Sequence, residues 1–272
     1  MDYTSTAYKD GRVVVMRSGW NPNDVYLYSD VTPNTSHAHK AHNQIIMFAY
    51  GKYLLTDQLF YTYTSTDPIY APIRSTRMHN TVEINNTSHG DGSATNGQLQ
   101  KWITNNAFDL SRLRTDASGA AAHERNIVYI KPGFFIVSDY LVPKTPGVKN
   151  YKQHWHMMPR NNLELDPITG IGRTNFQGEA NIIVAPASLN GITPSIDNTG
   201  LFSEGTGSLT SNVPYLRYEQ ETASNAVFDT LLVPEKFGDN ITVSSVKLDL
   251  ANVSNNGATA MEFEIENQTE NT

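Results

Sequence analysis

Short runs of β-branched and aromatic residues, each ended by turn-forming residues, recur along the whole chain. Arg12–Arg17, Phe134–Leu141 and Val227–Val233 are representative, and residues of this kind favour strands. No window of the sequence has apolar residues at the spacing of an amphipathic helix. This density of strands, separated by glycine and proline, predicts an all-β fold: a large antiparallel β-sandwich without a substantial helical domain.

The first part of the chain contains two candidate hairpins. Residues 12–17 and 25–29 flank a turn-rich segment, and residues 45–50 and 53–56 flank Gly51. A chain of 272 residues, 39% of them hydrophobic, is long enough to bury the core of a sandwich of this size. We expect residues 1–265 to form one domain and the polar tail 266–272 to be frayed.

Charge and cysteine content exclude several functions. A net charge of −7 argues against a nucleic-acid partner, because such proteins need a basic surface to meet phosphates. No apolar run approaches the ~20 residues that span a bilayer, so no membrane partner is expected. The chain has no cysteine, so any transition metal must be held by histidine and carboxylate ligands.

Three of the eight histidines fall within the six residues from His37 to His42. In a strand, residues two apart share a face, so His37 and His39 would point the same way. Two imidazoles on one face are suited to a metal ion or to a polyanion, although an H-x-H pair is also typical of surface or half-buried histidines. The hairpin about Gly51 places Asp57 opposite residue 45, so the chain must bend after Lys40 before Asp57 can meet His39.

Two segments together resemble one enzyme family. Ser36–Gln44 contains H-A-H at residues 37–39. The apolar hairpin that follows ends in L-L-x-D at Asp57, eighteen residues after His39. Arg74–Val82 has the sequence R-S-T-R-M-H-N-T-V. With Gln153–His156, these segments resemble the heparinase II/III-like family of polysaccharide lyases, and the resemblance covers nearly the whole chain. It implies the β-sandwich that forms the second domain of those enzymes.

The resemblance implies a metal ion at His39, Asp57 and His79, which match the liganding positions of the family. Zinc is the expected ion, because it accepts neutral imidazole and carboxylate ligands together. Its expected role is mainly structural, tying the hairpin about Gly51 to the strand after His79.

The resemblance also implies that His37 is catalytic and lies beside the substrate uronate. The reaction in the family is a β-elimination, in which a base removes the C5 proton of a uronic acid, the carboxylate is neutralised and the O4 leaving group is protonated. Histidine suits either task because its pKa is near neutrality. The alternative is that His37 only supports the neighbouring metal site.

Tyr61, Tyr70 and Arg74 are the predicted substrate-binding residues, in the polar and aromatic segment after Asp57. Tyrosines stack on sugar faces or donate hydrogen bonds, and arginine binds a carboxylate with two parallel hydrogen bonds. The alternatives are half-exposed tyrosines of the sandwich and a structural ion pair of Arg74 or Arg77 with Asp67 or Glu83.

The sequence contains nothing helical of the size of the toroid that precedes the sandwich in this family. We therefore interpret the chain as the C-terminal domain of a bacterial polysaccharide lyase, acting on a glycosaminoglycan or an alginate-type uronan and inactive by itself. The expected partners are this acidic polysaccharide and the N-terminal helical toroid of the parent. A periplasmic or secreted location is implied, although no signal peptide is evident at residues 1–3. The alternative function is a free-standing, metal-stabilised carbohydrate-binding or scaffold module without catalysis.

Overall fold

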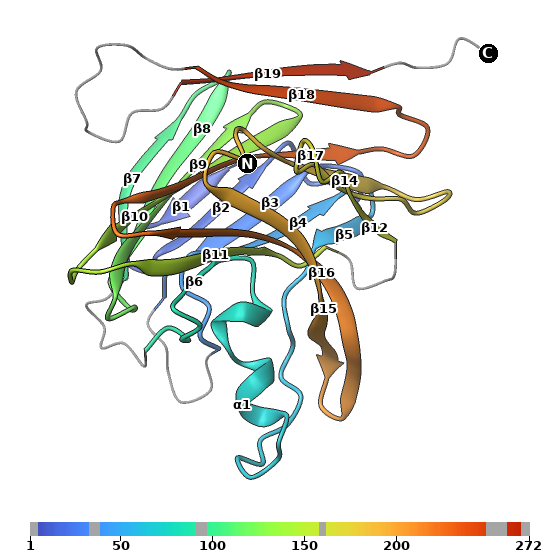
Figure 1. Ribbon diagram of the computed structural model, residues 1–272. Helices are drawn as coiled ribbons and strands as arrows, with labels where there is room; N and C mark the ends of the chain where they lie inside the picture. The colour runs from blue at the N-terminus through green and yellow to red at the C-terminus, as the bar shows by residue number, and fades with distance from the viewer. Residues whose placement is uncertain (1–4, 33–38, 91–96, 158–161, 249–259, 268–272) are drawn as a thin grey trace.

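The computed structural model describes residues 5–32, 39–90, 97–157, 162–248 and 260–267. Their strands form three larger sheets and one two-stranded sheet (Figure 1). Within this described part the only helical segments are α1 (Tyr70–Ile73) and one 3-10 turn (Thr76–Met78), and neither is long and apolar enough to cross a bilayer. The predicted all-β sandwich is confirmed.

The N-terminal sheet has its strands in chain order. Both predicted hairpins are present, and the second turns through Tyr50 and Gly51, with φ values of 53° and 83°. Positive φ at both central residues is the geometry of a tight hairpin turn whose twist matches the flanking strands, and glycine adopts it without a steric cost. The five strands are β1 (Thr6–Tyr8), β2 (Val13–Arg17), β3 (Tyr26–Asp30), β4 (Gln44–Ala49) and β5 (Lys52–Leu55).

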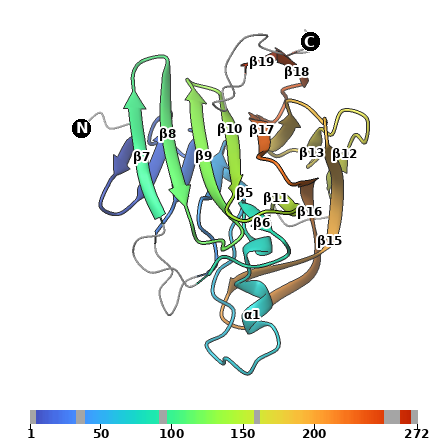
Figure 2. The same ribbon diagram turned by 60° about the vertical axis from the view of Figure 1, so that its left-hand side comes forward.

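The largest sheet has eight strands in the order β12-β13-β14-β17-β10-β9-β8-β7. In Figure 2 its green strands lie in front of the blue N-terminal sheet. The strands are β7 (Gly97–Thr104), β8 (Phe108–Thr115), β9 (Ala121–Ile130), β10 (Phe134–Pro143), β12 (Leu163–Leu165), β13 (Gly172–Thr174), β14 (Asn181–Pro186) and β17 (Ala226–Glu235).

Two smaller sheets complete the fold. One has the order β15-β16-β11-β6, and the other pairs β18 with β19. β19 extends two residues past the predicted domain boundary at 265, and residues 268–272 of the predicted tail lie outside the described residues. The strands are β6 (Val82–Ile84), β11 (Lys149–Trp155), β15 (Ile192–Gly205), β16 (Ser208–Thr222), β18 (Ile241–Leu248) and β19 (Ala260–Asn267).

One continuous apolar core joins the three larger sheets. Its buried members include Leu27 and Met47 from the N-terminal sheet, Ile127 and Phe135 from the eight-stranded sheet, and Trp155 from β11. A second, smaller cluster lies under β18 and β19, on the other face of the large sheet. Burying both faces of one sheet in this way is how a multilayer β-fold excludes water from its apolar side chains.

A buried ion pair lies within the main core. Arg125 on β9 and Asp139 on β10 are fully buried and joined by two hydrogen bonds of 2.6 and 2.7 Å. His123 and Gln153 also bind the carboxylate, at 2.7 and 2.8 Å, so each of its oxygens has two partners. Burial alone would raise the pKa of Asp139, but the charge of Arg125 and these hydrogen bonds lower it.

Asp139→Asn should lower the free energy of unfolding by about 3–5 kcal/mol, because it leaves the buried Arg125 guanidinium without its opposite charge. Urea unfolding at neutral pH measures the loss. Asp116→Asn is the matched control: Asp116 pairs with Arg114 at 3.4 Å, with side chains that are 43% and 36% exposed, and its loss should cost about 1 kcal/mol or less. Equal losses in the two variants would show that the buried pair has no special role.

Candidate functional site

His39, Asp57 and His79 lie side by side, although they come from three separate segments. Nδ1 of His79 is hydrogen-bonded to a carboxylate oxygen of Asp57, and the rings of His39 and His79 have centroids 5.1 Å apart. The bend predicted after Lys40 is present, because the amide of Gln44 donates to the carbonyl of Ala41 at 3.1 Å. The structure therefore brings together the three residues that the sequence predicted as metal ligands.

Side chains just after His79 fix the backbone of the other two segments. The Asn80 side-chain amide donates to the carbonyls of Ile45 and Thr56, at 2.8 and 2.7 Å. The Thr81 hydroxyl donates to the carbonyl of His42 at 2.6 Å. These contacts connect the segment that bears His79 to the strands next to His39 and Asp57, and they explain the N-T pair of the R-S-T-R-M-H-N-T-V sequence.

Arg125, on β9 of the eight-stranded sheet, also binds these loops. Nη1 of Arg125, the residue paired with Asp139, donates to the carbonyls of Asn43 and Asn80, at 2.6 and 2.7 Å. Because a buried backbone carbonyl without a donor is costly, these bonds fix where the loops enter the core. Sequence reasoning did not identify Arg125 or Asn80, since neither role is visible before distant strands are brought together.

Two buried ring nitrogens of the site have no hydrogen-bond partner within the described residues: Nδ1 of His39 and Nε2 of His79. Burial, followed by the nearby His79, lowers the pKa of His39 to about 4, so its ring is neutral at pH 7. Burial raises the pKa of Asp57, but His79 and His39 outweigh it and lower that pKa. The result is a neutral His39 imidazole next to the His79 ring and to one carboxylate anion, that of Asp57.

This donor set suits zinc by chemical type, since neutral imidazole and carboxylate are its ligands alongside thiolate. Within the described residues, no three or more His, Cys, Asp or Glu side chains converge closely enough to hold a metal ion as they stand. Asp57 is instead bonded to Nδ1 of His79, the arrangement by which a carboxylate orients a metal-binding histidine from outside the coordination sphere. The residues fit zinc by type, and a direct Asp57 contact would require its side chain to turn.

An aromatic and cationic group borders His39. The ring of Phe60 lies 6.0 Å from that of His39, and the guanidinium carbon of Arg74 lies 5.6 Å from the Phe60 ring and 4.6 Å from the Tyr70 ring. Tyr70 and Arg74 are thus next to the predicted metal ligands, on the segment with α1 that projects from the sandwich in Figure 1. Phe60 is a further member that the sequence did not indicate.

Two predicted site residues are not joined to this group. The carbonyl of Tyr61 accepts a hydrogen bond of 2.9 Å from Gly207, so its backbone is tied to the β15–β16 hairpin. No ring or side-chain hydrogen bond links Tyr61 to the other candidates among the described residues. His37 lies outside the described residues, and its predicted catalytic role remains a prediction.

Further histidines are buried next to the site. His42 and His89 are 1% and 2% exposed, with ring centroids 5.6 Å apart. Neither ring nitrogen of His42 has a hydrogen-bond partner within the described part of the chain. Burial, and then the neighbouring His123, lowers the pKa of His42 to about 4.

Both the sequence and the fold of this chain match known proteins. The family model described as Heparinase II/III-like, C-terminal, matches residues 2–231. The fold is similar to that of the heparan sulfate lyase HepC from Pedobacter heparinus, with a TM-score of 0.86 and 17% identity over 99% of this chain and 43% of that one. It is also similar to heparinase III, with a TM-score of 0.82 and 18% identity over 97% and 41%. The chain thus spans less than half the length of these enzymes, and no curated protein matches it significantly.

Lowering the pH from about 7 to about 4.5 should lower the free energy of unfolding, in part through His42. The unfolded chain protonates His42 near pH 6.5, whereas the folded chain does so only near pH 4. Stability is therefore lost as the pH falls below about 6.5. His42→Leu should weaken this dependence of the free energy of unfolding on pH, measured by urea unfolding at each pH. An unchanged pH dependence would show that the idea is wrong. Thr81→Val, which removes the hydrogen bond to the His42 carbonyl, is the control that should lower stability without altering the pH dependence.

Proposed function

Because the chain matches the C-terminal domain of heparinase II/III-like proteins and so belongs to that family, we propose that it is part of a lyase that cleaves a uronic-acid-containing polysaccharide by β-elimination. The main support is one cluster of residues: His39, Asp57 and His79 meet beside Arg74 and Tyr70. The cluster combines imidazole, carboxylate, guanidinium and phenol groups, which is the chemistry that an acidic sugar and its proton transfers require.

Arg74 supplies the positive charge that this reaction needs. In β-elimination the C5–H bond breaks, its electron pair forms the C4–C5 double bond, and the C4–O4 bond breaks as O4 receives a proton. Negative charge accumulates on the uronate carboxylate before O4 leaves, so a cation held against that carboxylate lowers the barrier. The Arg74 guanidinium, kept beside the faces of Tyr70 and Phe60, binds a carboxylate through parallel N–H groups.

His37 and the tyrosines complete the proposed cleft. In this function His37 contacts the uronate and either neutralises its carboxylate or moves a proton, whereas Tyr70 and Tyr61 contact the sugar. The principal proton carrier comes from the N-terminal helical toroid of the parent enzyme, which forms the other wall of the cleft. A glycosaminoglycan or an alginate-type uronan is the substrate class, and a periplasmic or secreted location accompanies it.

Zinc at His39, Asp57 and His79 would act as a structural clamp. His39 and His79, each with a buried ring nitrogen that has no partner among the described residues, would hold the ion, and the ion would supply a link between the segment before β4 and the segment before β6. Asp57 then acts either as a ligand or through its hydrogen bond to His79. In both arrangements the chain's own residues bind and orient the substrate, and the ion stabilises the loops that position them.

The metal proposal predicts about one zinc ion per chain in protein purified without chelators. His79→Ala should lose the metal and lower the Tm, because removing one ligand weakens the clamp between two loops. Elemental analysis and thermal unfolding measure both effects. His154→Gln is the control, since the buried His154 ring lies beside Tyr215 and Glu83 and not against these ligands' rings in any contact among the described residues, and its loss should lower the Tm with the metal retained. Absence of stoichiometric metal from the unmodified chain would refute the clamp.

The lyase proposal is tested in the full-length parent with a panel of uronate polysaccharides, by the ultraviolet absorbance of the unsaturated product. His37→Ala should reduce turnover by about 10²–10⁴-fold with the metal intact. Arg74→Ala should also reduce turnover, and it should raise KM. His39→Ala should lose metal and stability together.

The 272-residue chain alone should show little or no cleavage in the same assay, because half of the cleft is then missing. Strong activity of the chain alone would contradict the assignment of the proton carrier to the toroid. If the full-length parent binds the polysaccharides without cleaving any of them, the chain is a carbohydrate-binding module and the lyase proposal fails.

A further inference from the structure

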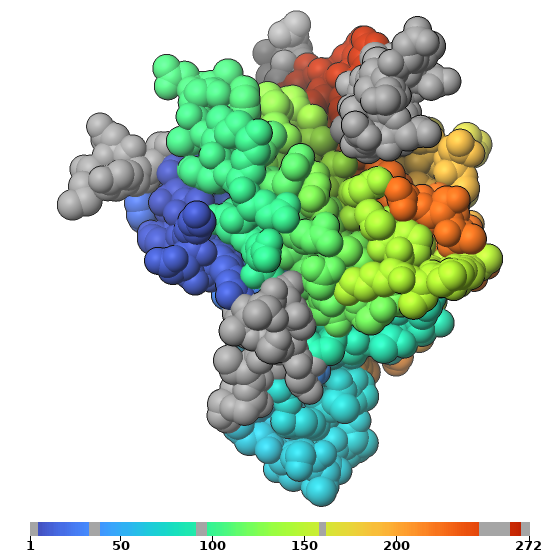
Figure 3. All heavy atoms as spheres, turned by 90° about the vertical axis from the view of Figure 1, so that its left-hand side faces the viewer, coloured from blue at the N-terminus to red at the C-terminus, as the bar shows by residue number. Residues whose placement is uncertain are grey.

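A cavity opens on the outer face of the eight-stranded sheet, with a volume of about 280 Å³. Its lining comes from alternate residues of adjacent strands, which share a face because side chains alternate along a strand. In cross-strand register Arg112 lies opposite Asn126, and Asn126 opposite Ser138. In the next row Arg114 lies opposite Glu124, and Glu124 opposite Tyr140. In Figure 3 the green strands of this sheet form much of the face toward the viewer.

This cavity lies on the opposite side of the sheet from the candidate functional site. Arg125 points into the core, where it reaches the carbonyl of Asn80 next to His79. Its neighbours Glu124 and Asn126 therefore point outward, into the cavity. A sugar bound here cannot also contact His39, so the cavity is a separate site.

The lining offers hydrogen-bond donors to a ligand. Both partners of Arg112 contact its Nε, Asn126 at 3.0 Å and Glu124 at 3.3 Å, and within the described residues its two terminal amino groups have no other protein partner. The Asn126 side-chain oxygen accepts from Arg112, which leaves its amide group as a donor. The Tyr140 hydroxyl accepts a hydrogen bond of 2.5 Å from Asn225 and so retains its own proton to donate.

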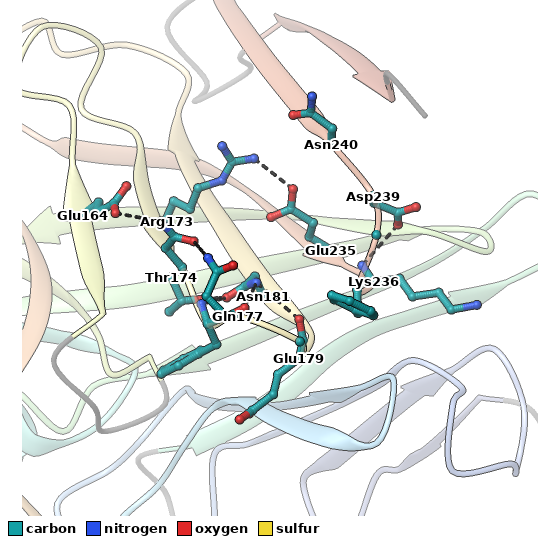
Figure 4. A pocket seen from close by; sticks show the side chains of 15 residues that line it. Glu164, Arg173, Thr174, Gln177, Glu179, Asn181, Glu235, Lys236, Asp239 and Asn240 are labelled. Carbon is teal, nitrogen blue, oxygen red and sulfur yellow. Dashed lines mark hydrogen bonds and ion pairs between the residues drawn. The ribbon is translucent and has the colours of Figure 1, made fainter. Parts of the chain in front are cut away.

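The charge of this lining is opposite to that of the chain as a whole. Two arginines and one carboxylate, that of Glu124, line the cavity, and Lys101 lies opposite Arg112 on the outermost strand, whereas the chain has a net charge of −7. Outside the lining, Arg114 also pairs with Asp116, and the Ser138 hydroxyl donates to Asp229. A pocket at the other end of the sheet differs in the charge of its lining (Figure 4). It is lined by four carboxylates against two cations: Glu164, Glu179, Glu235 and Asp239 with Arg173 and Lys236. Of these two linings, that with Arg112 and Arg114 has more cations than carboxylates, so it is the better suited to an anion.

We propose that the Arg112–Arg114 cavity is a second, non-catalytic binding site for an anionic sugar residue of an acidic polysaccharide. Its volume is near the lower end of the ~300–1,000 Å³ of ligand pockets, which suits one sugar ring with the rest of the polymer extending over the sheet. The guanidinium groups bind the carboxylate or sulfate, and Asn126 and Tyr140 bind ring hydroxyls. The ligand class rests on the proposed function, whereas the site rests on its own geometry.

Such a site would hold the polymer while the cleft acts on another part of it. Two binding sites on one chain raise the effective concentration of a long ligand at each site, so avidity grows with polymer length. The arginines are partly exposed, with side-chain exposures of 45% and 36%, so binding should weaken as salt screens the charges.

The test is calorimetry of the 272-residue chain with three probes: a heparin octasaccharide, an oligomannuronate octasaccharide and a neutral maltooligosaccharide. The two anionic probes distinguish sulfate from carboxylate as the bound group, and the neutral one should not bind. The double variant Arg112→Ala/Arg114→Ala should weaken binding of at least one anionic probe about tenfold or more. Glu124→Gln should strengthen it, because it removes the only anion of the lining.

Two controls make the outcome decisive. Lys236→Ala removes one positive charge from the pocket in Figure 4 and should leave affinity unchanged, whereas Arg74→Ala alters only the cleft. If Arg74→Ala abolishes binding and the double variant does not, the glycan sits in the cleft, and this inference is overturned while the proposed function stands. Absence of binding to either anionic probe also overturns it, and the cleavage assay on the parent still tests the lyase proposal independently.

Discussion

The buried pair of Arg125 and Asp139 is the interaction on which the arrangement of this protein depends. Two charges enclosed by an apolar core are tolerated only when each is paired and hydrogen-bonded. Here each oxygen of the carboxylate has two donors. The remaining terminal nitrogen of Arg125 binds the carbonyls of Asn43 and Asn80, which lie on two loops that come from other sheets. One side chain therefore determines how the large sheet meets the loops of the candidate site.

The candidate site is built from loops, and its rigidity has to come from hydrogen bonds to main-chain carbonyls. Asn80 and Thr81 bind the strands and turn next to His39 and Asp57, so hydrogen bonds hold the three short segments together. This explains how an exposed segment such as the one around α1 can place Tyr70 and Arg74 beside His39 without a strand beneath it. Binding residues on loops that a rigid scaffold positions are the usual arrangement in enzymes.

Strand alternation gives the large sheet two different faces. Along β9, His123, Arg125 and Ile127 face the core, whereas Glu124 and Asn126 face outward. The inward face bears the network that supports the loops around His79, and the outward face bears the cationic cavity. A polymer that binds both sides must pass around the edge of the sheet, so the two sites are suited to a long polysaccharide.

The sequence by itself determined the all-β class and the two N-terminal hairpins, because these follow from local periodicity and turn residues. His39, Asp57 and His79 were singled out by the resemblance to the heparinase II/III-like family. The sequence did not reveal β7, β8 or β15, whose exposed positions carry polar residues and dilute the apolar signal. The contacts of His39 with Phe60, and of Arg125 with Asn80, were decided by tertiary structure alone. The physical reason is that local sequence fixes which way a side chain points within its own strand or turn, whereas the partner it meets depends on how distant segments pack around a shared core.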